Sequence, residues 1–195
     1  MPKTILISGS PKPDGNTAQL MRECAKVVQE QGVEAEVISF AGMSIASCNA
    51  CGKCSETGEC DIHDDLNEII KKVRGAQGLI VGSPVYFGTA RGDVMSALQR
   101  IGYVSMHSNK FLAGMVGGPI AVARRGGQTS TLQEMLMFFL INDMIVPGST
   151  YWNMVFGRLP GEVWKDQEGI DTIRHFAANV AKLVKRLYPS AGNAS

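Results

Sequence analysis

Four of the five cysteines in this chain fall within one short segment. Two, two and five residues separate them in turn, while the fifth, Cys24, lies apart; the four are Cys48, Cys51, Cys54 and Cys60. In a chain without an export signal, such clustering is typical of metal or redox sites rather than of a disulfide framework. Small residues at Ala50, Gly52 and Gly58 permit the backbone to wrap so that four thiolates converge. The spacing favours a [4Fe-4S] cluster, with structural zinc and metal-free thiols or disulfides as the alternatives.

A loop rich in glycine, proline and hydroxyl side chains follows the first apolar run, residues 4–8. It carries four side chains that suit a phosphate group, namely Ser10, Lys12, Asn16 and Thr17. The free backbone N–H groups at the start of a helix expected over 17–31 would add to them. Neither the glycine pattern of nucleoside-triphosphate loops nor that of dinucleotide loops is present. The loop predicts a monophosphate site, and the alternative is a turn that only caps the helix.

A second loop, residues 83–92, follows the apolar run 78–82. Its aromatic residues Tyr86 and Phe87 are suited to pack beside a flat heteroaromatic ring whose polar edge bonds to the loop N–H groups. In a doubly wound sheet of order 2-1-3-4-5, the strands that precede the two loops are neighbours at the switch point. We therefore expect both loops to face one crevice and to serve one site.

Strands and helices alternate along the chain in the apolar pattern. Strands are expected over 4–8, 34–40, 78–82, 111–116 and 144–150, and helices over 17–31, 92–104, 128–142 and 168–188, with another that opens at 64–65. Such alternation implies right-handed crossovers and a parallel sheet covered on both faces. The expected fold is α/β, a flavodoxin-like doubly wound five-stranded parallel sheet of order 2-1-3-4-5. We expect one domain over 1–189, with a cysteine-rich loop at 46–63 and a frayed tail at 190–195.

Composition narrows the classes of function. The chain has 195 residues, 45% of them apolar, and 19 basic against 18 acidic side chains, for a net charge of +1. This length is enough for a full core, and the charge balance argues against a strongly basic nucleic-acid surface and against disorder. The N-terminus lacks a signal-peptide pattern, and no apolar run is long enough to cross a bilayer. We expect a cytoplasmic protein with neither nucleic-acid nor membrane partners.

The two loops resemble those of the NAD(P)H-dependent FMN reductase superfamily. The matching motifs are Gly9-Ser10-Pro11-x-x-x-Gly15-Asn16-Thr17 and Gly82-Ser83-Pro84-Val85-Tyr86-Phe87, and the cysteine segment resembles the compact motif of the iron-sulfur flavoproteins. The resemblance implies a flavodoxin-like fold, bound FMN, and dimers that pair into tetramers. By position it implies that Ser10, Lys12, Asn16 and Thr17 hold the FMN phosphate, and that the isoalloxazine is lined by Pro84, Val85, Tyr86, Phe87 and Gly88. The family more often has arginine at the place of Lys12, which keeps the charge but has a different donor geometry.

Two further segments bear on the site and on assembly. Residues 124–127 are a looser match to a third flavin-side loop, and the alternative is a solvated turn. The stretch 135–144 is too rich in methionine and phenylalanine for a single core-facing stripe, which favours a buried subunit interface. Tyr151, Trp152 and Phe156 belong either to that interface or to a flavin face.

Together these features predict an oxidoreductase that passes electrons between FMN and the cluster, with no catalytic side chain. A flavin accepts two electrons and releases them singly, so the pair would join two-electron and one-electron partners. The resemblance implies ferredoxin as donor and a quinone or an oxygen species as acceptor. The alternative is a cluster-free reductase of FMN or quinones with NAD(P)H as donor, and a third hypothesis is a non-enzymatic FMN-binding or metal-sensing regulator.

Overall fold

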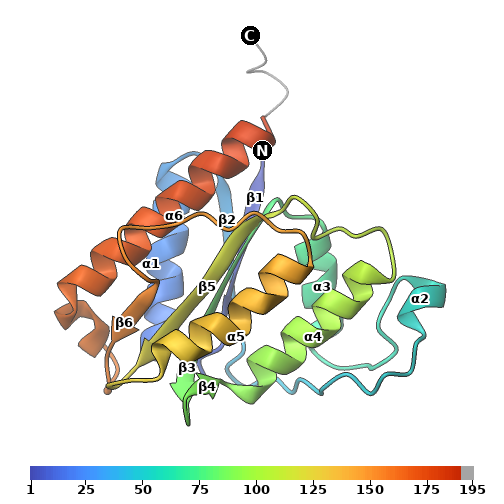
Figure 1. Cartoon of the computed structure of the whole chain (residues 1–195), viewed down its shortest axis with the longest axis horizontal. Helices are drawn as coiled ribbons and strands as arrows, with labels where there is room; N and C mark the ends of the chain where they lie inside the picture. Colours follow the sequence, from blue (N-terminus) through green and yellow to red (C-terminus); the bar gives the residue numbers. More distant parts are fainter. Residues whose placement is uncertain (190–195) are drawn as a thin grey trace.

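A parallel β-sheet runs through the centre of the molecule, with helices on both faces (Figure 1). The computed structural model describes residues 1–189, so the predicted tail at 190–195 lies outside the described residues. The strands are β1 (Lys3–Ser8), β2 (Glu34–Ser39), β3 (Gly78–Tyr86), β4 (Thr89–Ala90), β5 (Val116–Ala123) and β6 (Met154–Phe156). Their order is β2-β1-β3-β5-β6 with parallel pairing throughout, and β4 pairs with β3 outside this path. The α/β flavodoxin-like class is as predicted.

The predicted count of five strands is wrong, because a short hairpin adds a sixth. Strand β4 pairs antiparallel with the end of β3, Val85 with Ala90 and Tyr86 with Thr89. The two residues between them, Phe87 and Gly88, have φ values of 53° and 83°. Positive φ at both central residues is the signature of a type I′ turn, whose twist matches that of the flanking strands. The hairpin extends β3 beyond the predicted end at residue 82.

The predicted positions of the last two strands are also wrong. The fourth long strand begins at Val116 rather than at residue 111, and it contains Gly117, Gly118 and Pro119. Glycine and proline are depleted in strands. A segment that contains three of them is therefore not predicted as a strand from its sequence. Close approach of two backbones explains the glycine, because a Cβ at position 117 would lie 1.7 Å from the carbonyl oxygen of Leu79. Residues 144–150 form only one isolated bridge, and the last strand is β6.

Two groups of helices cover the two faces of the sheet. Helices α1 (Asn16–Glu30) and α6 (Gln167–Leu187) lie on one face, and α3 (Leu66–Arg74), α4 (Gly92–Met106) and α5 (Gln128–Ile141) lie on the other (Figure 1). The short α2 (Cys54–Thr57) lies at the edge beyond α4, and the 3-10 helix η1 (Glu162–Lys165) precedes α6. Successive residues of β1 divide between two cores: Ile5 and Ile7 pack towards α3 and α4, and Leu6 packs towards α1 and α6.

The apolar stretch of α5 is less exposed than the interface prediction requires. Met135, Phe138 and Phe139 of this helix, and Met144 just beyond its end, lie in the core of the single chain. The prediction of an interface is wrong for these four. What stays on the surface is a strip at helical spacing formed by Met137, Leu140 and Ile141, which are 55–70% exposed. We call these three residues the α5 strip.

None of the helices within residues 1–189 combines the length and the apolar character needed to span a membrane.

The parallel pairing of the sheet places the carboxyl ends of β1, β3, β5 and β6 at one edge. In folds of this class ligands bind in the crevice outside those ends. The loops at this edge therefore determine the site.

Candidate functional site

A pocket of about 230 Å³ opens at the carboxyl edge of the sheet, and we call it the phosphate-loop pocket. It is formed by the carboxyl ends of β3 and β5 and by the segments that follow β1, β5 and β6. Seven of the residues predicted for the flavin site line it, namely Ser10, Lys12, Asn16, Thr17, Pro84, Val85 and Tyr86. The expectation that both loops face one crevice is therefore confirmed.

The loop after β1 is held by its own side chains. The Ser10 hydroxyl donates to the carbonyl oxygen of Lys12 at 2.7 Å, and it accepts from the Lys12 backbone N–H at 3.1 Å. The N–H of Gly15 donates to the same carbonyl at 3.1 Å. A Cβ at position 15 would lie 2.3 Å from the Ser10 Oγ, so only glycine lets the loop close. Ser10 thus shapes the loop as well as lining the pocket.

Asn16 and Thr17 form the first turn of α1. The Asn16 Oδ1 accepts from the Gly161 N–H at 2.9 Å, which ties the start of α1 to the segment before η1. Thr17 is almost fully buried. No side chain caps the helix at Gly15, so its first N–H groups are free to bind an anion.

The charged side chains around this pocket are all cations. They are Lys12, Arg124 and Arg158, and no carboxylate lines the pocket. Three cations beside a helix start suit a phosphate, since hydrogen bonds from charged donors to phosphate oxygens are the strong ones. Arg124 comes from the looser match at 124–127. Sequence reasoning missed Arg158, because it follows β6, a strand whose predicted position was wrong.

At the tip of the β3–β4 hairpin, not every residue predicted to line a flavin ring lines the pocket. Tyr86 lines the pocket, whereas Phe87 and Gly88 are not among the lining residues, and Phe87 is fully exposed at the turn. The Ser130 hydroxyl donates to the Gly88 carbonyl oxygen at 2.5 Å and holds the tip against the start of α5. A role for Phe87 and Gly88 beside a flavin stays a prediction.

A second pocket, of about 120 Å³, is lined by all four clustered cysteines, and we call it the cysteine pocket. The opposite wall comes from Arg100 and Tyr103 of α4 and from His107, which follows the end of that helix. All four thiols are free. The segment turns at Ala50, Gly52 and Gly58, each with positive φ, which is how the small residues between the cysteines let it wrap.

The arrangement of the cysteine side chains bears on the kind of metal group that they could hold. Among residues 1–189, no three histidine, cysteine or acidic side chains stand close enough to hold one metal ion. Four thiolates on one zinc lie about 3.8 Å apart, as follows from tetrahedral Zn–S bonds. In a cubane each thiolate binds a different iron, so the sulfurs stand farther apart. Burial, and then the neighbouring charges at Cys48, Cys51 and Cys60, raise the pKa of Cys54 above its ordinary value.

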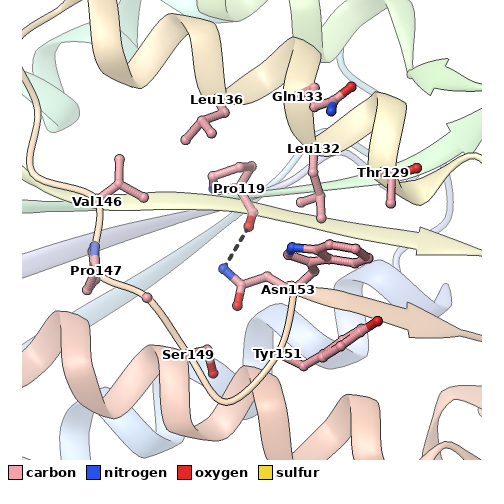
Figure 2. Close-up of a pocket in the computed structure, with 12 residues that line it drawn as sticks. Pro119, Thr129, Leu132, Gln133, Leu136, Val146, Pro147, Ser149, Tyr151 and Asn153 are labelled. Carbon is pink, nitrogen blue, oxygen red and sulfur yellow. Dashed lines mark hydrogen bonds between the residues drawn. The ribbon is translucent and has the colours of Figure 1, made fainter.

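A third pocket, of about 720 Å³, lies between α5 and the segment 146–153 (Figure 2). Figure 2 shows Leu132 and Leu136 of α5 on one side and Val146, Pro147 and Tyr151 on the other. No charged side chain lines it, so it does not suit a phosphate group. The Asn153 amide Nδ2 donates to the Pro119 carbonyl oxygen at 3.2 Å across its floor. Tyr151 and Trp152 line this pocket and not the phosphate-loop pocket.

Comparison with known proteins agrees with the geometry at the sheet edge. Residues 2–158 match the family of NADPH-dependent FMN reductases. An iron-sulfur flavoprotein of Methanocaldococcus jannaschii is 40% identical over 190 residues, which cover 94% of this chain and 97% of that protein. An iron-sulfur flavoprotein of Methanosarcina thermophila is 32% identical over 184 residues, with 92% and 93% covered.

Solved structures agree in fold. A flavodoxin, WrbA-like protein from Agrobacterium tumefaciens, superposes with a TM-score of 0.69 at 14% identity, over 95% of this chain and 99% of that one. The family match on residues 2–158 spans β1 to β6 and includes every charged residue that lines the phosphate-loop pocket.

Proposed function

The chain belongs to the NADPH-dependent FMN reductase family and is a flavoprotein oxidoreductase, and on that premise we propose that it transfers electrons between FMN and a [4Fe-4S] cluster. FMN would occupy the phosphate-loop pocket and the cluster the cysteine pocket. The observation that carries the proposal is that four free thiols line one pocket, in a chain whose relatives are named iron-sulfur flavoproteins.

In the phosphate-loop pocket the chain's role is to bind and orient. Lys12, Arg124 and Arg158 would neutralise the phosphate, and the first N–H groups of α1 would donate to its oxygens. Ser10, Asn16 and Thr17 shape and complete this end of the pocket. Pro84, Val85, Tyr86, Phe87 and Gly88 would line the isoalloxazine ring. No acid or base is required of the protein.

In the cysteine pocket the chain supplies four thiolates, from Cys48, Cys51, Cys54 and Cys60. FMN exchanges one or two electrons and the cluster exchanges one, so the pair connects two-electron with one-electron partners. We propose ferredoxin or NAD(P)H as the donor, and a quinone or an oxygen species as the acceptor. The assembly we propose is a homodimer or a homotetramer in the cytoplasm.

Single substitution of a cysteine tests the cluster half of this proposal. Cys51→Ala should lose iron and acid-labile sulfide while FMN content is kept, because the two pockets share no lining residue. Cys24→Ala is the matched control, since Cys24 lies buried on α1 and lines neither pocket. Full iron and sulfide in Cys51→Ala would refute the ligand assignment.

A second candidate is a cluster-free NAD(P)H-dependent reductase of FMN or quinones. The finding that favours it is the match of residues 2–158 to the family of NADPH-dependent FMN reductases, a description that names NADPH and FMN and no cluster. Stopped-flow reduction separates the candidates. Rapid bleaching of the flavin by NADPH in protein without iron would favour this second function over electron exchange with a cluster.

A further inference from the structure

Arg100 is the largest fully buried side chain of the molecule as described, although it is a cation. It lies on α4, lines the cysteine pocket and does not line the phosphate-loop pocket. A buried guanidinium is costly unless its charge is paired and its donors are satisfied. The proposed function uses no residue of this kind, so its burial requires a separate explanation.

Every N–H of this guanidinium has a partner. The Nε donates to the Cys60 Sγ at 3.2 Å, and the Nη1 donates to the Ala46 carbonyl oxygen at 3.2 Å and to Asp64 Oδ2 at 2.5 Å. The Nη2 donates to the Ile62 carbonyl oxygen and to the Asn67 Oδ1, both at 3.0 Å. Arginine carries five N–H donors in a planar fork, and all five are used here.

All five acceptors belong to one stretch of chain, residues 46–67, which contains the four cysteines. Asp64 strengthens the arrangement, because its carboxylate also accepts from the Ala46 N–H at 2.9 Å and from the Leu66 N–H at 3.0 Å. The two ends of the cysteine segment are thus joined through one ion pair. A lysine has three donors on a point charge and cannot reproduce this fork.

We propose that Arg100 is a positioning residue for the cysteine segment. Its five hydrogen bonds hold this segment folded around the guanidinium, so that Cys60 faces the pocket. In the loaded protein, its charge and its Nε–H bond to the Cys60 sulfur raise the reduction potential of the cluster. Hydrogen bonds to cluster sulfurs and nearby positive charge favour the reduced form, which is the more negative one. The effect on the potential rests on the proposed function, whereas the folding of the segment does not.

Two variants of Arg100 and one control test this role. Arg100→Met removes the charge and all five bonds, and Arg100→Lys keeps the charge but loses the fork. Arg74→Met is the matched control: Arg74 also binds the cysteine segment, but its hydrogen bond goes to the Gly58 carbonyl oxygen and not to a sulfur. FMN content reports for each variant whether the domain is folded.

The first readout is amide hydrogen exchange in FMN-loaded protein, whether or not iron is present. Arg100→Met should accelerate exchange about tenfold or more across residues 46–67, as expected for the loss of several bonds to a charged group. Arg74→Met should accelerate it only around Gly58. Unchanged exchange across 46–67 in both Arg100 variants would overturn the positioning role.

The second readout is the reduction potential of the cluster in protein purified without oxygen. The potential should be more negative in Arg100→Met, less so in Arg100→Lys, and unchanged in Arg74→Met. A purely structural role would lower iron content without moving the potential of the molecules that remain loaded, and that result would overturn the effect on the potential. Wild-type protein with neither iron nor sulfide would refute the proposed cluster, while the exchange readout still decides the role of Arg100.

Discussion

Three cations that are distant in sequence meet at the start of α1. The loop motif predicts Lys12 and the looser match at 124–127 contains Arg124, whereas Arg158 is evident only in the structure. The phosphate end of the pocket therefore depends on side chains from three loops. In the proposed complex with FMN, each would supply a charge-assisted bond of the kind that contributes about 1.5–3 kcal/mol.

Loss of one of these cations should weaken binding of the phosphate and not of the ring. Lys12→Met should reduce affinity for FMN about tenfold, because it removes a charged hydrogen bond to the phosphate. The effect is no larger because Lys12 is exposed and water screens its charge. Riboflavin has the same ring without the phosphate and serves as the control ligand. Fluorescence titration with both ligands measures the effect, and an equal loss of affinity for riboflavin would contradict the assignment.

Gly15 sets the shape of the same loop. Gly15→Ala should weaken FMN binding, because the added Cβ would lie 2.3 Å from the Ser10 Oγ and would break the bonds between Ser10 and Lys12. Gly126→Ala is the control, since a Cβ there meets nothing within 4 Å. Isothermal titration with FMN compares the two variants; equal affinity for both would mean that the loop adapts.

At the scale of elements, the sequence predicts the helices and strands whose apolar pattern matches the faces that they bury. Helices α1 and α6 carry clear apolar stripes, and β1 is a plain apolar run, so they lie within a few residues of the predicted bounds. The predicted position of β5 is wrong because the strand contains two glycines and a proline, which have low strand propensity. Gly117 is there because two backbones approach closely at that position. The loop motifs placed seven residues in one pocket, but Arg158 depends on β6, which is only three residues long.

The edge strand β2 is tied to its neighbours by Glu36. Its carboxylate accepts from the Lys3 Nζ at 2.6 Å and from the Lys72 Nζ at 2.7 Å, joining β2 to β1 and α3. The bond from Lys3, followed by that from Lys72, lowers the pKa of Glu36 below its ordinary value of 4.5. The contribution of this carboxylate to stability is therefore present above pH 4.5 and is lost as the pH falls below it.

Glu36→Gln should reduce stability above pH 4.5 and make the acid limb of the stability curve shallower. The loss should be no more than about 1 kcal/mol, because partial exposure screens the pairs. Urea unfolding between pH 3 and pH 7 measures it, with Glu168→Gln on α6 as the control. A variant with the same slope as the wild type below pH 4.5 would show that these ion pairs add nothing.

For the whole molecule, the α5 strip bears on assembly. Met137, Leu140 and Ile141 are exposed at helical spacing, whereas the rest of the apolar stretch fills the core. If the chain forms the proposed homodimer or homotetramer through this strip, Ile141→Glu should shift it towards a smaller species in analytical ultracentrifugation. Lys182→Glu, at an exposed position of α6, is the control. An unchanged assembly in Ile141→Glu would place the interface elsewhere.

The cofactor content of the whole protein tests the central claim most directly. The measurement is iron, acid-labile sulfide and FMN in protein purified without oxygen. The proposed electron transfer between FMN and a cluster predicts about four iron and four sulfide per FMN. FMN with neither iron nor sulfide would contradict it and would favour the cluster-free reductase.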